Sequence, residues 1–226
     1  MKVSCVTTFS NKGYEEYAHR MMDSWVKNWA KDITLHVYHD VPHPQFYRQF
    51  PPNVKLWNFD PKDLRDFRNR NKNNPKQKYG DDMYDGIKFC HKAFAFVHQC
   101  EKLIDLKEQI LIFLDADIIT HSPVTANEMV ELLDGKLGAC LSKPNMPTDT
   151  SFHIIDLDHG DCRQFVKELG DYYRKDKIWD LEAHTDCYAY DEVRKHVGEE
   201  KFTNLTSSLC SKWMDHHKGE RKKEIV

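Results

Sequence analysis

The chain has 226 residues, of which 40% are hydrophobic and 31% are charged, and its net charge is −3 when the histidines are neutral. This length allows one large domain with a sizeable buried core, and the composition excludes a disordered or fibrous protein. The nearly balanced charge gives no indication of a dedicated nucleic-acid-binding protein.

The first half of the chain alternates predicted strands with a predicted helix. Short apolar and β-branched runs predict three strands, at residues 2–8, 33–38 and 54–59. Apolar residues four apart predict a helix over residues 14–29, one face of which carries Tyr17, Met21, Trp25 and Trp29. This order is typical of an α/β domain with a parallel sheet. The polar, basic stretch at residues 61–82 predicts a long loop.

A long helix over residues 83–106 precedes the most hydrophobic run of the chain, ILIFL at residues 110–114. That run predicts a central strand, buried on both faces of the sheet. The rest of the pattern predicts helices at residues 126–133 and 162–173, and strands at residues 137–141 and 152–157. After Trp179 the pattern breaks up into short pieces. Because no linker is evident, we predict one α/β domain over residues 1–226, with a central, mostly parallel sheet flanked by helices.

The predicted central strand runs directly into Asp115-Ala116-Asp117. Ligands of α/β sheets bind beyond the carboxyl ends of strands. Two carboxylates two residues apart at such an end can converge on one cation, and hard oxygen ligands suit Mg²⁺ or Mn²⁺. A metal held there can bridge a diphosphate and stabilise the charge of a leaving nucleoside diphosphate. We therefore predict that Asp115 and Asp117 bind a divalent metal.

The segment LDADIITHSPV around this pair resembles the DxD signature of the GT-A glycosyltransferases, and of the glycogenin-like retaining family in particular. The N-terminal VTTFSNKGYEEYA resembles the first strand and turn of that family, and the closing HHKGERK resembles its His-x-x-Gly-x-x-Lys pattern. The helix KFCHKA and the ending DHHKGERK are similar to compact glycosyltransferases of phages and other microbes. The resemblance implies a Rossmann-like GT-A fold, with a nucleotide-binding zone at residues 1–120 and an acceptor zone and metal-binding tail at residues 121–226.

The resemblance also implies the ligands of the metal and of the donor phosphates. It makes His216 the third metal ligand beside Asp115 and Asp117, and it places the Gly219 amide and Lys222 on the diphosphate. An imidazole with two carboxylates is a plausible shell for Mn²⁺, and a lysine with a glycine amide suits a diphosphate. Two alternatives stay open here: His217 replaces His216 as ligand, or Asp215 also reaches the metal.

Further roles implied by the resemblance concern the donor base and the sugars. The residues implied to contact the base of a UDP-sugar are Thr7, Thr8 and Tyr14. The residues implied to act on the sugars are Lys92, which faces the donor sugar, Asp186, which touches the transferred sugar, and Asp149, which lies on the acceptor side. Transfer with retention at the anomeric carbon is likewise implied by the resemblance. The residues alone do not give it: no general base can be assigned from them, and an inverting enzyme would need one.

The acceptor stays open, because the chain departs from the family pattern at residues 149–152 and carries an additional segment at residues 61–82. One expectation is a hydroxyl of a lipopolysaccharide-type or other glycan. The other is a modified DNA base, with the basic residues 65–78 and the basic tail at residues 218–223 tracking phosphates. Two further alternatives are a metal-dependent phosphoesterase or nuclease and a nucleotide-sugar-binding protein without turnover.

Seven cysteines occur without a CxxC pair, the N-terminus turns polar after one short apolar run, and no run of about 18 apolar residues exists. These features predict reduced thiols, no membrane span and a cytoplasmic location. The oligomeric state is left open.

Overall fold

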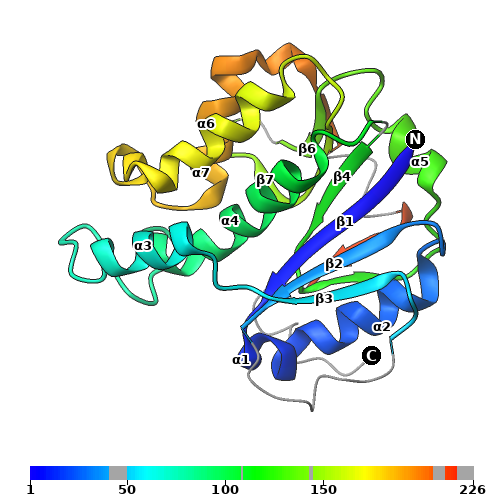
Figure 1. Cartoon of the computed structure of the whole chain (residues 1–226), viewed down its shortest axis with the longest axis horizontal. Coiled ribbons are helices and arrows are strands. Elements are labelled where there is room, and N and C mark those ends of the chain that lie inside the picture. The colour runs from blue at the N-terminus through cyan, green and yellow to red at the C-terminus, as the bar shows by residue number, and fades with distance from the viewer. Residues whose placement is uncertain (41–49, 108, 143–144, 206–211, 218–226) are drawn as a thin grey trace.

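A seven-stranded sheet forms the centre of the computed structural model (Figure 1), which describes residues 1–40, 50–107, 109–142, 145–205 and 212–217. The described strands are β1 (Lys2–Phe9), β2 (Thr34–His39), β3 (Val54–Asn58), β4 (Gln109–Leu114), β6 (Gly138–Leu141), β7 (Asp149–Asp156) and β8 (Phe202–Asn204). Their order in the sheet is β3-β2-β1-β4-β7-β6-β8, and among them only β7 runs antiparallel to its neighbours. A separate ribbon pairs β5 (Ile118–Thr120) with β9 (Met214–His216). The expected mostly parallel α/β sheet is confirmed.

Helices cover both faces of this sheet (Figure 1). One face carries α3 (Lys62–Asn71), α4 (Gly86–Leu103), α6 (Cys162–Arg174) and α7 (Asp186–Val197). The other face carries α2 (His19–Asn28) and α5 (Ala126–Glu131). The short elements are α1 (Asn11–Gly13), the π-helical η1 (Tyr14–Ala18), and the 3-10 turns η3 (Lys177–Asp180) and η4 (Glu199–Lys201). The predicted helix at residues 14–29 therefore exists, with one π-helical turn at its start.

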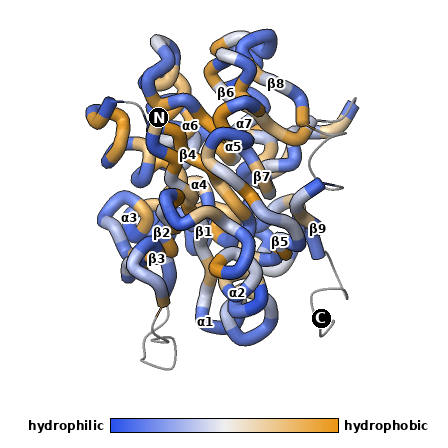
Figure 2. Tube along the Cα trace, turned by 90° about the vertical axis from the view of Figure 1, so that its right-hand side faces the viewer, coloured by the Kyte–Doolittle hydropathy of each residue, from blue (hydrophilic) through white to orange (hydrophobic). Residues whose placement is uncertain are grey.

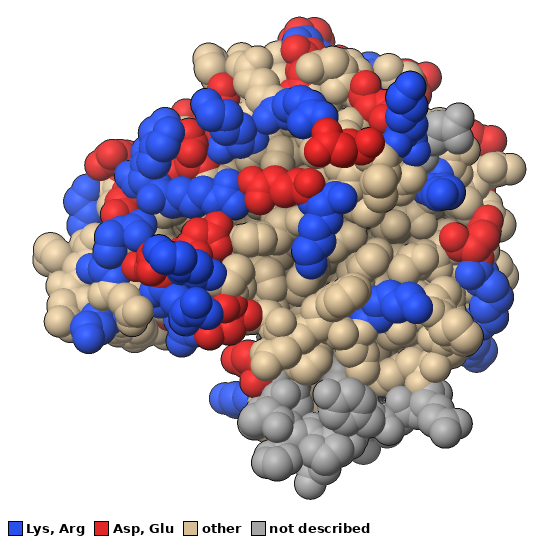
Figure 3. Space-filling view, viewed as in Figure 1, with Lys and Arg blue, Asp and Glu red and all other residues tan. Residues whose placement is uncertain are grey.

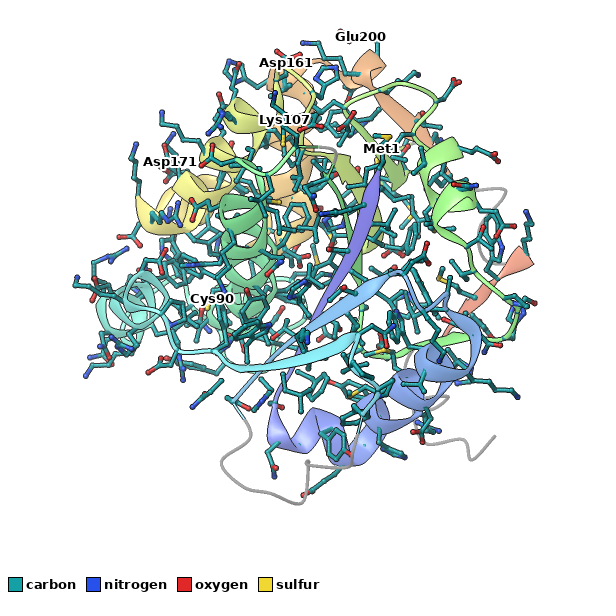
Figure 4. All side chains as sticks on the ribbon, turned by 45° about the vertical axis from the view of Figure 1, so that its right-hand side comes forward. Met1, Cys90, Lys107, Asp161, Asp171 and Glu200 are labelled. Atoms are coloured by element: carbon teal, nitrogen blue, oxygen red, sulfur yellow. The ribbon has the colours of Figure 1, made fainter. Side chains whose placement is uncertain are left out.

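Strand β4 divides the interior into two apolar layers. All six of its residues are buried; Ile110, Ile112 and Leu114 face the layer under α2 and α5, and Leu111 and Phe113 face the layer under α4 and α6. Figure 2 shows the apolar residues concentrated along the strands, and Figure 4 shows side chains filling both sides of the sheet, with the fully buried Cys90 of α4 among them. This confirms the prediction of a central strand that is buried on both faces.

The predicted loop at residues 61–82 is wrong in its first half, because Lys62–Asn71 form helix α3. Its residues are mostly charged, and only Leu64, Phe67 and Asn71 are buried. The ring of Phe67 lies 5.4 Å from that of Tyr173 and 6.0 Å from that of Trp179, measured between centroids. These contacts come from residues more than a hundred positions away, so packing stabilises a helix that the local apolar pattern is too sparse to predict.

The predicted breakdown of order after Trp179 is also wrong, since α7 runs for 12 residues. Its buried face mixes apolar residues with the carboxylates of Asp186 and Asp191. Two charged positions on the inward face obscure the helical period, which relies on apolar residues recurring three and four apart. The remaining predicted strands and helices are confirmed, with ends shifted by at most three residues.

Asp63 links α3 to α4 and α6 through hydrogen bonds, and replacing it tests this packing. Its carboxylate accepts hydrogen bonds from Arg174 Nε at 2.8 Å and His98 Nε2 at 2.9 Å. We expect Asp63→Asn to lower the free energy of unfolding by about 1–2 kcal/mol at pH 7, measured by urea denaturation. Asp66→Asn is the control, because the exposed Lys62–Asp66 pair contributes less than about 1 kcal/mol.

The pH dependence of this effect has a defined sign. Partial burial raises the pKa of Asp63, but the hydrogen bonds from Arg174 and His98 outweigh it, and the folded-state pKa lies below its ordinary value. The carboxylate therefore contributes its full stability above the unfolded pKa of about 3.9 and loses it as the pH falls through the folded value. An Asp63→Asn difference that persisted unchanged at pH 2 would contradict this assignment.

Among the described residues, no helix combines the length and the apolar character that a bilayer crossing requires. The six cysteines within this part of the chain are free thiols, and Cys210 lies outside it. Burial raises the pKa of all six thiols, and at Cys140 and Cys187 the pKa rises to about 11.

Candidate active site

A cleft of about 480 Å³ opens at the carboxyl ends of β1, β2 and β4. The chain connects β1 to β2 and β3 on one side, and then crosses to place β4 on the other side of β1. The order of strands thus reverses between β1 and β4, and such switch points are where open α/β sheets bind ligands. The cleft is lined by the end of β1 (Thr8, Phe9) with Ser10, by the end of β2 (His39) with Asp40, by Asp115 to Asp117 after β4, and by parts of α3 and α4.

Asp115 and Asp117 lie on a turn between β4 and β5. The Asp115 amide donates to the carbonyl of Ser151 at 2.8 Å, and the Ile118 amide donates to the Asp115 carbonyl at 3.2 Å. This turn directs both carboxylates to the end of the sheet. Burial raises the pKa of Asp115, the carboxylates of Asp117 and Asp186 raise it further, and the Lys92 ammonium opposes this rise. Carboxylates gathered at this density favour a cation between them.

The ribbon of β5 and β9 brings His216 to the same point, although it is about a hundred positions further along the chain. Ile118 pairs with His216 across this ribbon, and His216 Nε2 lies 3.0 Å from Asp117 Oδ1. One ligand atom each from Asp115, Asp117 and His216 lies within 4.8 Å of the others. An octahedral ion with bonds of about 2.1 Å separates its ligands by roughly 3–4 Å, so this set fits a Mn²⁺ or Mg²⁺ ion.

The alternative ligands His217 and Asp215 are directed elsewhere. The backbone amide of His217 donates to the Asp117 carbonyl at 3.1 Å, and its Nε2 lies 3.7 Å from the Asp215 carboxylate. Asp215 pairs with Ile119 in the ribbon, and 46% of its side chain is exposed. His216 is the last residue of β9 and His217 lies beyond the strand, and of the two only His216 belongs to the group whose ligand atoms lie within 4.8 Å of one another.

We expect the two histidines to differ in a metal titration. His216→Ala removes a ligand and should weaken Mn²⁺ binding at least about tenfold, since even outer partners of metal ligands commonly contribute that much. His217→Ala should change the affinity less than about threefold. Titration of each variant with Mn²⁺, followed by the paramagnetic resonance of the free ion, measures both values. Equal losses in the two variants would contradict the assignment of His216.

Lys92 of α4 connects the acidic pair to α7. Its ammonium lies 2.9 Å from Asp115 Oδ1, 3.1 Å from Asp186 Oδ2 and 3.1 Å from Thr150 Oγ1. The side chain is only 16% exposed. Burial alone would lower the pKa of Lys92, but the carboxylates of Asp115 and Asp186 raise it above its ordinary value. The lysine is therefore a fixed positive charge beside the candidate metal site.

The residues predicted to contact the base are placed unequally. Thr8 lines the cleft, whereas Thr7 is fully buried and does not. The ring of Tyr14 stacks on Phe9 with centroids 5.8 Å apart and is outside the lining, which contains Tyr17 instead. Asp149, at the start of β7, accepts a hydrogen bond from the Ser151 amide at 3.0 Å and is also outside the lining.

Gly219 and Lys222 lie outside the described residues. The structure adds lining residues that the sequence analysis did not identify, namely Tyr17, His39, Asp40, Arg68, Lys88 and His91. His39 and Asp40 had a usable signal, because polar residues directly after a predicted parallel strand lie at the ligand-binding edge of the sheet. Arg68 had none, since its helix was not predicted.

No protein-family model and no curated protein matches this chain. Among solved structures, the apo form of mouse xyloside xylosyltransferase 1 is 12% identical with a TM-score of 0.56, over 91% of this chain and 85% of that one. The apo form of the glycosyltransferase GlyE of Streptococcus pneumoniae TIGR4 is 13% identical with a TM-score of 0.56, and the match covers 91% of this chain and 45% of GlyE. The bifunctional glycosyltransferase WbbM is 11% identical with a TM-score of 0.53, and the match covers 90% of this chain and 38% of WbbM.

This chain therefore spans most of the xylosyltransferase but less than half of GlyE and of WbbM. At 11–13% identity the likeness concerns the fold, and every one of these neighbours is a glycosyltransferase. The strand order, the acidic turn after β4 and these neighbours lead to one conclusion: the chain has the GT-A fold of glycosyltransferases.

Proposed function

We propose that this chain is a metal-dependent, hexosyltransferase-like glycosyltransferase that moves a sugar from a UDP-sugar to an acceptor hydroxyl. The observation that carries the proposal is the convergence of Asp115, Asp117 and His216 at the switch point of a GT-A fold. The adjoining cleft of about 480 Å³ lies within the range of roughly 300–1,000 Å³ that small-molecule sites occupy. Retention at the anomeric carbon rests on the family resemblance alone.

Each residue has a role in this proposal. Asp115, Asp117 and His216 hold Mn²⁺ or Mg²⁺, and the ion supplies positive charge to the diphosphate of the leaving UDP. Lys92 adds a second fixed positive charge on the same side, in a place where little water screens it. For Gly219 and Lys222, which lie outside the described residues, we propose contacts with the phosphates.

The remaining proposed roles concern the base and the sugars. The end of β1 at Thr7 and Thr8 offers backbone groups to the uracil, together with Tyr14 at the start of the following helix. Asp186 and Asp149 accept hydrogen bonds from sugar hydroxyls. Because Asp186 already pairs with Lys92 and Thr150, its carboxylate is fixed in position before any sugar enters.

A thermal-shift screen of UDP-, GDP-, TDP- and CMP-sugars, each with and without Mn²⁺, tests the proposal. A ligand that binds only the folded state raises its stability by mass action. We expect one UDP-sugar to raise the melting temperature by several degrees, and only when Mn²⁺ is present. No shift with any nucleotide sugar in the presence of Mn²⁺ would contradict the donor site and leave the proposal without its central support.

A further inference from the structure

A second pocket of about 480 Å³ adjoins the candidate active site on the side of α3. It is lined mainly by Arg65, Arg68, Asn69 and Lys72 of α3 and its C-terminal end, by Tyr79, and by Ile87 of α4. Arg68 and Ile87 line both this pocket and the main cleft. The two hollows therefore lie side by side, and a molecule bound in the α3 pocket lies next to the main cleft.

Most of the basic residues around this pocket are neutralised by acidic neighbours. Three ion pairs bring Arg65 to Asp60 at 3.0 Å, Arg70 to Asp176 at 2.9 Å and Lys88 to Asp82 at 2.7 Å. Figure 3 shows this alternation of basic and acidic side chains over the part of the surface where α3 lies. The basic stretch at residues 65–78 is thus not a continuous positive surface.

Two cations that line the α3 pocket, Arg68 and Lys72, are not neutralised in this way. Arg68 and Lys72 are four positions apart on α3 and its C-cap, so they share one face of the helix. Neither forms an ion pair with any residue in the described part of the chain. The one acidic residue of the pocket, Asp60, is already paired with Arg65. The pocket therefore presents two uncompensated positive charges beside the catalytic cleft.

The wall opposite α3 is held in a defined position. The buried carboxylate of Asp85, which caps α4, accepts hydrogen bonds from the amides of Gly80 at 2.7 Å and Lys88 at 2.9 Å. Gly80 has a φ of +80°, which favours glycine. Tyr79 donates from its hydroxyl to the Lys72 carbonyl at 2.9 Å, and 63% of the residue is exposed. An exposed, fixed aromatic face beside two cations is suited to a sugar ring that carries a negative group.

We propose that the α3 pocket binds the acceptor, and that this acceptor is an acidic saccharide carrying a carboxylate or a phosphate group. The inference rests on the proposed glycosyltransferase function and names the acceptor class for it. Arg68 and Lys72 bind the anionic group, Tyr79 contacts the sugar ring, and the opening past Ile87 leads the acceptor hydroxyl toward the main cleft.

The same observations disfavour the alternative of a DNA acceptor. A protein that tracks a duplex neutralises many phosphates with basic residues spread along its surface. Here three of the six basic residues in the stretch 65–78 are in ion pairs, and Arg68 and Lys72 converge on one pocket. A single anionic group on a small sugar matches this arrangement.

Three matched probes test the proposal: methyl glucoside, methyl glucuronide and methyl glucoside 6-phosphate, titrated by ligand-observed NMR without any donor. We expect both acidic probes to bind at least about tenfold more tightly than the neutral one, and to weaken as salt is raised. The variant Arg68→Gln/Lys72→Gln should lose about tenfold for the acidic probes and leave the neutral probe unchanged. The control Lys31→Gln/Lys62→Gln removes the same charge from exposed sites outside the pocket and should change neither.

Three outcomes would overturn the proposal. The first is equal affinity for the neutral and acidic probes. The second is displacement of the acidic probes by UDP with Mn²⁺, which would assign the pocket to the donor. The third is DNA binding that the Arg68→Gln/Lys72→Gln variant abolishes without any preference among the saccharides. An error in the proposed donor site is distinguished from an error in the acceptor proposal, because the nucleotide thermal-shift screen tests the donor site and these titrations contain no donor.

Discussion

Replacing Asp117 with alanine is expected to reduce sugar transfer at least about a thousandfold while leaving the protein folded. Asp117 is 7% exposed and lies 3.0 Å from His216, so its carboxylate is the central member of the three-residue cluster. Without it the metal loses a ligand and the departing diphosphate loses its main source of compensating charge, an effect of several kcal/mol. The rate of UDP release with saturating donor and Mn²⁺ measures the loss.

Asp215→Ala is the matched control for this variant. Asp215 lies on the same ribbon, next to His216 in sequence, but its side chain is 46% exposed and pairs with His217. We expect this variant to keep its activity within about threefold, because Asp215 is exposed and is not one of the three clustered residues. A circular dichroism spectrum unchanged in both variants separates loss of the site from loss of the fold. Full activity of Asp117→Ala in the presence of Mn²⁺ would show that the site assignment is wrong.

Replacing Lys92 with methionine is expected to lower both stability and activity. The ammonium compensates the carboxylates of Asp115 and Asp186, and the Asp186 side chain is only 6% exposed. Removing one partner of a buried ion pair leaves an uncompensated charge, at a cost of about 3–5 kcal/mol. Urea denaturation of the metal-free protein at pH 7 measures this loss of unfolding free energy.

The choice of pH 7 for that measurement follows from the direction in which the pKa of Lys92 is shifted. Asp115 and Asp186 raise the pKa of Lys92 in the folded state, so the stability that its charge contributes is fully present below the unfolded pKa of about 10.4. It is lost only as the pH rises through the higher folded value. A comparison at pH 7 therefore reports the whole contribution.

Two further variants distinguish charge compensation from packing at Lys92. Asp186→Asn added to Lys92→Met removes the uncompensated charge, and we expect the double variant to recover part of the lost stability. Lys88→Met, on the exposed side of the same helix, should cost less than about 1 kcal/mol because its partner Asp82 is exposed. Additive losses in the double variant would contradict the proposed pairing of Lys92 with Asp186.

The acidic turn and its strand were predictable from the sequence because they depend on local pattern. An apolar strand that leads directly into two aspartates determines both a buried strand and a polar strand end. The third member of the cluster was not predictable by periodicity, since His216 reaches Asp117 through pairing between β5 and β9. Only the family resemblance indicated it, and the distance of His216 from Asp117 in the structure then distinguishes it from His217.

Where the sequence reading failed, long-range packing or an irregular turn is the cause. Helix α3 depends on the contacts of Phe67 with aromatic residues from distant segments, so its cation Arg68 was not recognised as part of the cleft. In the π-helical turn at Tyr14–Ala18, it is Tyr17, not Tyr14, that lines the cleft. A π-helical turn changes the direction of each side chain relative to a regular helix, and the local sequence pattern does not predict such a turn.

Anomalous diffraction from a crystal grown with UDP and Mn²⁺ tests the central claim most directly, because manganese is located by its own scattering. We expect one anomalous peak between the carboxylates of Asp115 and Asp117 and Nε2 of His216, in contact with the UDP phosphates. A peak elsewhere in the molecule, or bound UDP with no peak beside these three residues, would contradict it.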